Sequence, residues 1–368
     1  MTPLVSDAAH NLQKLLASHK VGDAIPGQHD LARILGVSRP TVRGLLQRYL
    51  DQGAVTSRRG DATYLMQPVS KPTAVASGGT TIGLVVPKIE IPWVARIVRE
   101  LEKVEKTLDV NLVLKSTGDQ REQEIALLSQ LWRTGIRKII VFPSWGNVHN
   151  PEYQRMINAM RSSESAIVSI DNPIHNFDIP CVSTDHVQTG YLLTNHLIER
   201  GHRQILMVGG FEAEGFSFRE RLHGYWNALR DAGIPNQEHL IIDTSECPLE
   251  AGDAAYQQVS SYLSRRGMDF SAVIGVHDDY AWGAAKALIE YGKKIPSDVS
   301  IVGVDDNRKE VMGVPLTTMA HPSEKIARLA MRLVSQRGND TIEVGHRSLF
   351  SPILVERGSV ARAQQALS

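Results

Sequence analysis

The stretch CVSTDHVQTGYLLTNHLIERGHRQILMVGG, residues 181–210, contains the unit that is repeated through most of this chain. Two short apolar segments, at 181–185 and 204–210, flank a segment at 187–200 that we predict to be a helix. Short apolar runs of this kind are typical of parallel strands that helices cover on both faces. The stretch therefore predicts a strand, a helix and a second strand of an α/β fold.

The same alternation extends from residue 81 to residue 306. Helices are predicted at 92–107, 119–134, 151–163, 187–200, 218–232, 250–265 and 280–291. Strands are predicted at 81–87, 111–117, 138–144, 166–172, 181–185, 204–210, 239–244, 272–279 and 299–306. We expect two sets of four or five strands, the second beginning at residue 181, in two lobes with a cleft between them.

Several predicted strands end in a polar or acidic cluster. These clusters are Asp171-Asn172, His277-Asp278-Asp279 and Asp305-Asp306. Ligands of open α/β sheets bind outside the carboxyl ends of the strands, so topology alone makes all three clusters candidates for a binding site. The alternative for each acid is that it caps the helix that follows the strand.

Sequence patterns of common enzymes are absent from the chain. It has no P-loop, no G-x-S-x-G, no H-E-x-x-H and no G-x-G-x-x-G after a strand. Adjacent residues at one strand end rarely converge on a metal ion, which argues against a metal at His277-Asp278-Asp279. The two cysteines, Cys181 and Cys247, form neither a disulfide framework nor a C-x-x-C pair. We predict a protein without catalytic activity, cofactor or metal.

The first 66 residues do not show this alternation of strands and helices. Helices are predicted at 6–19, at 28–35 and within GVSRPTVRGLLQRYLDQG, residues 36–53, where Ser38 is a good N-cap. Residues 53–66 alternate like a small hairpin with a turn near Gly60. Residues 67–80 are rich in Pro, Ser, Gly and Thr and are predicted to be a linker.

Positive charge is concentrated in this N-terminal part. The whole chain carries 40 Lys+Arg and 40 Asp+Glu, yet residues 31–60 contain six arginines and one acid. Arg39, Thr41 and Arg43 lie near the start of the third predicted helix, and Arg58 and Arg59 lie in the hairpin. The short helix at 28–35, the turn that follows it and the next helix match the helix-turn-helix layout. In that layout the second helix enters the major groove of DNA. The alternative is an ordinary basic surface on a protein-binding domain.

Residues 21–65 resemble the GntR-type winged-helix domain, most specifically in GVSRPTVR at 36–43. The resemblance implies DNA contacts by the following residues: Ser38, Arg39, Thr41, Arg43, Arg59 and Gly60. His29 stands where many members have Arg or Glu, and Arg58 extends the basic wing, so both join the predicted DNA-binding set. Ala62 replaces the second glycine of the usual G-x-G wing tip.

Residues 81–358 resemble the LacI/GalR-type regulators, which share the type I periplasmic-binding-protein fold. The motifs are VSTDHVQTGYLLTNHLIERGHRQILMVGG, RERLHGYWNALRDAGI, AVIGVHDDYAWGAAKAL, IPSDVSIVGVDD and PLTTMAHPSEKIARLA. The effector contacts that this resemblance implies fall on Trp93, Asp185, Arg221, Asp278 and Asp305. His277 replaces the family's Asn, and His321 replaces a Gln or Arg. Trp145 is a further aromatic candidate for stacking on a sugar.

The combination is similar to the arabinose-type repressors, a GntR head on a LacI-type effector domain. We predict a winged-helix domain at 1–66, a linker at 67–80, an effector-binding and dimerisation domain at 81–358 and a tail at 359–368. The predicted function is a ligand-responsive transcription regulator, a repressor that binds operator DNA as a homodimer and responds to a carbohydrate. The alternatives are a sugar or nucleoside sensor acting through protein partners, and an enzyme on the same scaffold.

Location and coupling follow from two further observations. No signal peptide opens the sequence and no run approaches the length of a membrane span, so we expect a cytoplasmic protein without membrane contact. The linker contains Pro68, Pro72, Gly78 and Gly79 and should not form the hinge helix of LacI-type proteins. The coupling of effector binding to DNA binding is therefore expected to depend on the spacing of the DNA-binding heads or on the order of the linker.

Overall fold

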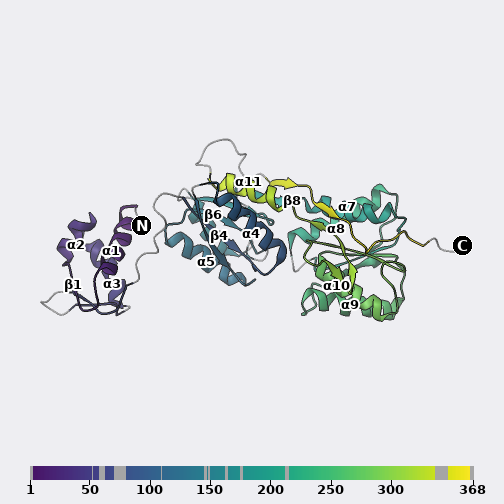
Figure 1. The fold of residues 1–368 in the computed structure, drawn as a ribbon, viewed down its shortest axis with the longest axis horizontal. Helices are drawn as coiled ribbons and strands as arrows, with labels where there is room; N and C mark the ends of the chain where they lie inside the picture. Colours follow the sequence, from purple (N-terminus) through teal and green to yellow (C-terminus); the bar gives the residue numbers. More distant parts are fainter. Residues whose placement is uncertain are drawn as a thin grey trace. The chain divides into compact units, whose positions relative to one another are not determined.

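The structure is a computed structural model with two compact units, Met1–Gly79 and Thr80–Ser368, which we call the N-terminal unit and the large unit (Figure 1). It describes residues 3–51, 53–57, 63–69, 80–108, 110–144, 147, 150–161, 165–174, 177–211, 215–335 and 347–364. None of the helices in these ranges is long and apolar enough to cross a lipid bilayer.

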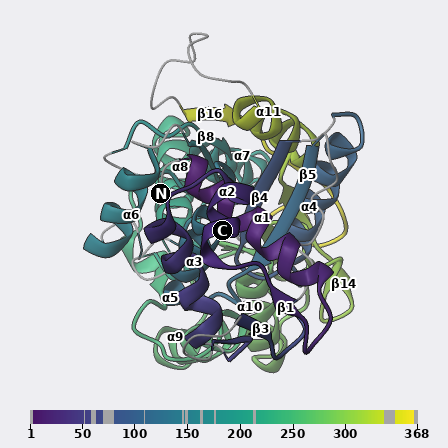
Figure 2. The same cartoon turned by 90° about the vertical axis from the view of Figure 1, so that its left-hand side faces the viewer.

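The N-terminal unit contains three helices and a small antiparallel sheet, seen from a second side in Figure 2. Its elements are α1 (Pro3–Ser18), β1 (Ala24–Ile25), α2 (Gln28–Leu35), α3 (Arg39–Asp51), β2 (Val55–Ser57) and β3 (Thr63–Leu65). The sheet has the order β1-β3-β2. Strand β1 was not predicted, because its two residues become a strand only by pairing with Tyr64 and Thr63.

Helix α3 begins as the sequence indicates. The Ser38 hydroxyl accepts a hydrogen bond from the Thr41 N–H at 3.4 Å and lies 2.8 Å from the Thr41 hydroxyl. One face of α3 buries Val42 and Leu46 in the core of the unit, together with Leu12, Leu31 and Leu65. Gly36 ends α2 with φ 65°, a left-handed conformation that suits glycine and turns the chain into α3.

The first lobe of the large unit is a six-stranded parallel sheet between two helical layers (Figure 1). Its strands are β4 (Thr80–Val86), β5 (Val110–Ser116), β6 (Lys138–Val141), β7 (Ala166–Ile170), β8 (Cys181–Thr184) and β16 (Arg347–Phe350). Its helices are α4 (Pro92–Glu105), α5 (Arg121–Arg133), α6 (Pro151–Arg161) and α11 (Ser323–Ser335). Residues of α4 and α11 share one hydrophobic core, and those of α5 and α6 share another.

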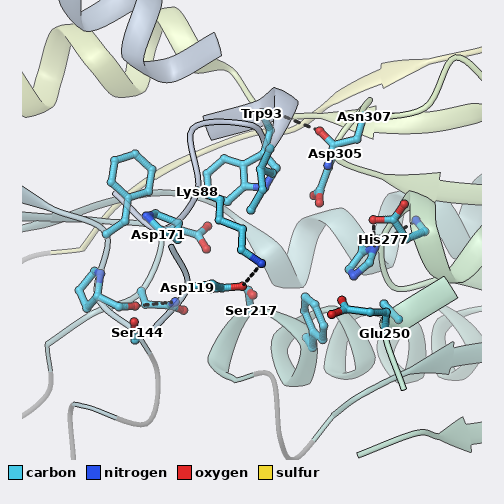
Figure 3. Close-up of a pocket in the computed structure, with 18 of the residues that line it drawn as sticks. Lys88, Trp93, Asp119, Ser144, Asp171, Ser217, Glu250, His277, Asp305 and Asn307 are labelled. Atoms are coloured by element: carbon cyan, nitrogen blue, oxygen red, sulfur yellow. Dashed lines mark hydrogen bonds and ion pairs between the residues drawn. The ribbon is translucent and has the colours of Figure 1, made fainter. Parts of the chain in front are cut away.

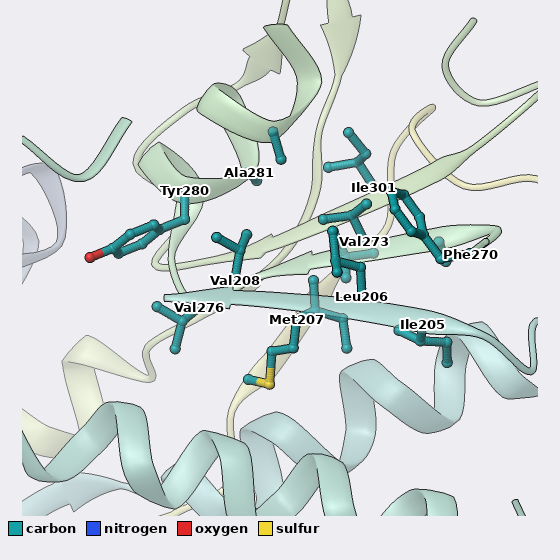
Figure 4. Close-up of a cluster of buried hydrophobic side chains, with 14 of the residues drawn as sticks. Ile205, Leu206, Met207, Val208, Phe270, Val273, Val276, Tyr280, Ala281 and Ile301 are labelled. Atoms are coloured by element: carbon teal, nitrogen blue, oxygen red, sulfur yellow. The ribbon is translucent and has the colours of Figure 1, made fainter. Parts of the chain in front are cut away.

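The second lobe has a second six-stranded sheet, in the order β10-β9-β11-β12-β15-β17. Its strands are β9 (Ile205–Gly209), β10 (Ile241–Asp243), β11 (Ala272–Gly275), β12 (Ser300–Val304), β15 (Thr317–Ala320) and β17 (Ile353–Val355), with β17 antiparallel to β15. Its helices are α7 (His186–Ile198), α8 (Phe216–Asp231), α9 (Ala251–Arg266) and α10 (Asp278–Glu290). Figure 4 shows the buried strands Ile205–Gly209 and Ala272–Gly275 packing against α10 through Tyr280 and Ala281.

Three small elements complete this lobe. The 3-10 helix η2 (Glu238–Leu240) precedes β10. Strands β13 (Glu310–Val311) and β14 (Val314–Pro315) pair with each other between β12 and β15.

The chain passes between the two sheets three times, after β8, after β15 and after β16. The prediction that the second set begins at residue 181 was wrong, because β8 pairs with β7 and with β16 in the first sheet. Each sheet has six strands instead of four or five. Pairing with the distant β16 could not be read from the local pattern.

Candidate functional site

A cavity of about 870 Å³ lies in the large unit, lined by residues of both lobes (Figure 3). Asp171 and Asn172 follow β7 of the first lobe, and His277 and Asp305 follow β11 and β12 of the second. All four therefore lie where strands end, as topology predicts. The volume falls within the range of small-molecule sites.

Asp171 and Asp305 have left-handed backbone conformations, with φ of 71° and 94°. Such values are uncommon for residues other than glycine and are tolerated best by Asn and Asp. Their occurrence at two cavity-lining strand ends fits the rule that strained residues gather at functional sites.

Asp305 forms a buried ion pair with Arg221 of α8. The Arg221 Nη2 lies 3.4 Å from Asp305 Oδ1, and the same oxygen lies 3.0 Å from His321 Nε2. Burial disfavours the charged carboxylate, but Arg221 and His321 outweigh that effect and hold the pKa of Asp305 well below its usual range. Arg221 also donates from Nη1 to the Val276 carbonyl at 2.6 Å.

Asp171 is paired with a second buried histidine. His186 Nε2 lies 2.8 Å from Asp171 Oδ1, and its Nδ1 lies 3.5 Å from Arg221 Nη2. Burial opposes ionisation of Asp171, but His186, His321 and Arg221 together lower its pKa. Burial also lowers the pKa of His186, against the influence of Asp171.

His186 and His321 lie at two of the three passages between the lobes, just after β8 and β15. His321 Nδ1 lies 2.6 Å from the Thr184 hydroxyl, which ties these two passages together. We call Asp171, His186, Arg221, Asp305 and His321 the crossover network. It joins both lobes, and its members Asp171, Arg221 and Asp305 line the cavity.

Aromatic rings form the apolar part of the wall. Trp93 lies at the start of α4, with its ring 5.0 Å from that of His321 and 5.8 Å from that of Phe142. Its backbone N–H donates to Asn307 Oδ1 at 3.0 Å, across the cleft. Phe218 lines the opposite side, 5.4 Å below the guanidinium of Arg221.

Asp278 does not line the cavity, although it was predicted to bind the effector. Its buried carboxylate accepts hydrogen bonds from the Asn307 N–H (2.6 Å), the Arg308 N–H (3.0 Å) and the Thr318 hydroxyl (2.7 Å). Its neighbours His277 and Asp279 line the cavity instead. Asp278 thus holds the loop that carries Asp305 and Asn307, and its predicted contact with the effector stays a prediction.

Asp185 is also absent from the lining residues. Its carboxylate accepts a hydrogen bond from the Gln188 N–H at 2.8 Å and caps α7, which was the alternative for such acids. Trp145 of the predicted effector set lies outside the described residues, as do Arg58, Arg59 and Gly60 of the predicted DNA-binding set.

Several residues that line the cavity were not predicted from the sequence. They include Lys88, Asp119, Arg121, Ser144, Ser217, Glu250, Asp253 and Asn307. Asp171 was a candidate through its strand-end cluster, but it was not placed in the predicted effector set, because no motif marked it. Within the described ranges, no group of three or more His, Cys, Asp or Glu is placed to hold a metal ion.

Protonation of Asp278 should affect stability. Burial, and then the negative charge of Asp305, raise the pKa of Asp278 to about 7 from 3.8. A raised carboxyl pKa stabilises the folded state while the carboxyl is protonated, and this contribution is lost as pH rises from about 4 through about 7. We expect Asp278→Asn to gain stability relative to wild type over that window, by up to roughly 4 kcal/mol. Urea unfolding at a series of pH values measures this difference, and a pH-independent difference would contradict it.

Comparisons with known proteins agree with this architecture. Residues 194–360 match the model of the periplasmic binding protein-like domain. The arabinose metabolism transcriptional repressor of Geobacillus stearothermophilus is 27% identical over 347 residues, 92% of each chain. The regulator GalR of Escherichia coli K12 is 29% identical over 350 residues, 90% of this chain and 95% of that one.

Solved structures give the same result for the large unit. A LacI family regulator from Enterococcus faecalis, solved with bound ribose, is 27% identical with a TM-score of 0.62, over 77% of this chain and 100% of that one. The regulator CcpA of Lactococcus lactis has a TM-score of 0.64 at 21% identity, over 77% of this chain and 100% of that one. The large unit therefore has the fold of a periplasmic-binding-protein-like domain, which residues 194–360 match directly. The chain that carries it is a transcriptional regulator.

Proposed function

We propose that this regulator is a repressor whose N-terminal unit binds operator DNA and whose cleft binds a sugar or sugar derivative. The observation that carries the proposal is the cleft, where polar and aromatic side chains of two lobes converge at strand ends. The protein acts in the cytoplasm, without catalysis, as a homodimer.

The N-terminal unit is a winged helix-turn-helix of the GntR type in this proposal. Its support is the order of the elements, with α2 and α3 joined by the turn at Gly36 and followed by β2 and β3. His29, Arg39 and Arg43 have exposed side chains on these helices. In this proposal Arg39, in the first turn of α3, reads a base edge, and the backbone and hydroxyls of Ser38 and Thr41 bind phosphate.

A sugar suits the chemistry of the cleft. Asp171 and Asp305 offer acceptors to hydroxyl groups, and Trp93 offers an aromatic face to the C–H side of a ring. His277 accepts from the Asp279 N–H through Nδ1, so its other ring nitrogen offers a donor. A ligand held from both sides favours closure of the lobes about the three passages. A differential affinity worth about 1–3 kcal/mol would give 5- to 150-fold control of DNA binding.

DNA binding is the test of this function. Genomic fragments retained by the full-length protein define a target, and binding is then measured against salt concentration. We expect affinity to fall steeply with salt, because released counterions drive binding. Arg39→Ala should weaken binding by about 1–3 kcal/mol, roughly 5- to 150-fold, because arginine contacts to guanine are worth that much.

The matched control is Arg328→Ala, which removes an exposed arginine from α11 of the large unit. Its affinity for DNA should equal that of wild type. Binding that is independent of salt, or equally weakened by both substitutions, would contradict the DNA-binding proposal.

A further inference from the structure

We propose that the cleft selects an effector without negative charge, a neutral polyhydroxylated molecule or one bearing a protonated amine, and rejects phosphorylated and carboxylated sugars. This inference rests on the proposed effector-binding function and narrows its ligand class. It is carried by the charges that line the cavity and by their pairing.

The only deeply buried cation of the described lining is already neutralised. Arg221 is 3% exposed, and both of its terminal nitrogens are engaged, by the Val276 carbonyl and by Asp305 and His186. Its Nε is buried without a hydrogen-bond partner among the described residues. A single N–H can serve one ligand oxygen, but phosphate is bound best by a two-pronged guanidinium contact, which Arg221 no longer offers.

The inner cavity presents carboxylate oxygens from both lobes. Asp305 uses Oδ1 for both Arg221 and His321, and Asp171 uses Oδ1 for His186. Within the described residues, Oδ2 of each has no hydrogen-bond partner, and both residues line the cavity. Ionised carboxylates only accept hydrogen bonds, so a ligand between them must donate one to each lobe.

The outer part of the cavity is acidic as well. Glu250 and Asp253 are exposed on the second lobe and have no ion-pair partner among the described residues. Lys88 lies 3.6 Å from Asp119, so its charge is largely compensated. The acidic lining residues are Asp119, Asp171, Glu250, Asp253, Asp279 and Asp305, and the basic ones besides His277 are Lys88, Arg121 and Arg221. Asp279 is compensated by Arg308, whose Nε lies 2.6 Å from its Oδ1.

The excess of acidic over basic side chains in the cavity lining disfavours the binding of anionic ligands. A phosphate monoester brings a charge of about −1.5 to −2 and only acceptor oxygens apart from its remaining proton. It would lie near carboxylate oxygens that lack hydrogen-bond partners, in a cleft with an excess of acidic side chains, where like charges repel and desolvation is costly. Hydroxyl and ammonium groups instead donate to the oxygens that lack partners.

The first experiment measures thermal unfolding of the full-length protein with matched probes. Each set contains a sugar, its amino form, its uronic acid and its 6-phosphate, for example galactose, galactosamine, galacturonic acid and galactose 6-phosphate. We expect stabilisation only by neutral or amino members. Stabilisation by a phosphate or a uronic acid, with none by its neutral counterpart, would overturn the inference.

The second experiment requires no knowledge of the effector and uses inorganic sulfate as the probe. Asp305→Asn leaves the guanidinium of Arg221 without its carboxylate, so this variant should gain a saturable rise in Tm of about 3 °C. Asparagine also tolerates the backbone of residue 305. The matched control is Asp306→Asn, because Asp306 pairs with Arg357 and Lys309 and does not line the cavity. Wild type and the control should show only the same gradual, non-saturable response.

Asp171→Asn provides a second variant should Asp305→Asn not fold, with an expected gain in the same direction, because it removes the other carboxylate that lines the cavity. A sulfate response in neither variant beyond that of wild type would overturn the inference. The two proposals fail separately, because the sulfate result concerns the charge of the cleft, whereas the proposed function fails on DNA binding.

Discussion

Arg221→Met is expected to abolish the response to the effector and to lower the free energy of unfolding by about 3–5 kcal/mol. The substitution keeps the bulk of the side chain but removes the cation from the crossover network. Asp305 would then lie buried with only His321 as a side-chain partner, and the Val276 carbonyl would lose its donor. The cost is large because an unpaired charge remains in a water-poor site.

Urea unfolding measures this loss, and Arg230→Met is its control. Arg230 lies on the same helix, but its side chain is 71% exposed, so its replacement should change stability little. The double variant Arg221→Met/Asp305→Asn should recover part of the lost stability, because it removes both charges. Equal effects of the Arg221 and Arg230 substitutions would contradict this account.

We expect Gly224→Ala to lower the free energy of unfolding by about 3 kcal/mol or more, the second of the two large effects. A Cβ at residue 224 would lie 2.0 Å from the Val187 carbonyl oxygen and 2.6 Å from the Tyr191 nitrogen. Both are backbone atoms of α7, so relief requires α7 and α8 to separate. Gly190 faces α8 in the same way, because a Cβ at residue 190 would lie 1.9 Å from the Arg221 carbonyl oxygen. Separation of the helices would therefore also displace Arg221 and weaken effector binding.

Thermal unfolding of the Gly224→Ala variant tests this prediction, and Gly44→Ala is the matched control. Gly44 is also a helical glycine, in α3, but a Cβ there would meet no atom within 4 Å. Alanine should stabilise that helix by up to about 1 kcal/mol, so one substitution should have opposite signs at the two sites. A mild effect at Gly224 would mean that the helices can part at little cost.

The local sequence pattern predicted most helices and strands of this protein. Helix α2 occupies residues 28–35 as expected, and α9 begins and ends within one residue of its prediction. These elements follow from apolar spacing and from the residues at helix ends, which act over a few positions. Strand β1 and the assignment of β8 failed, because both depend on partners far away in the chain.

The sequence by itself determined the α/β character of residues 81–306 and the edge at which the cleft lies, because short apolar runs and polar strand ends are local properties. Tertiary structure decided which of the adjacent residues face the cleft. His277 and Asp279 line it, whereas Asp278 turns toward Thr318 and the loop after β12. Tertiary structure also brought Asp171 and Asp305 together through two histidines at the passages between the lobes. The reason is physical, because the direction of a side chain at a strand end depends on hydrogen-bond partners and burial that distant segments supply.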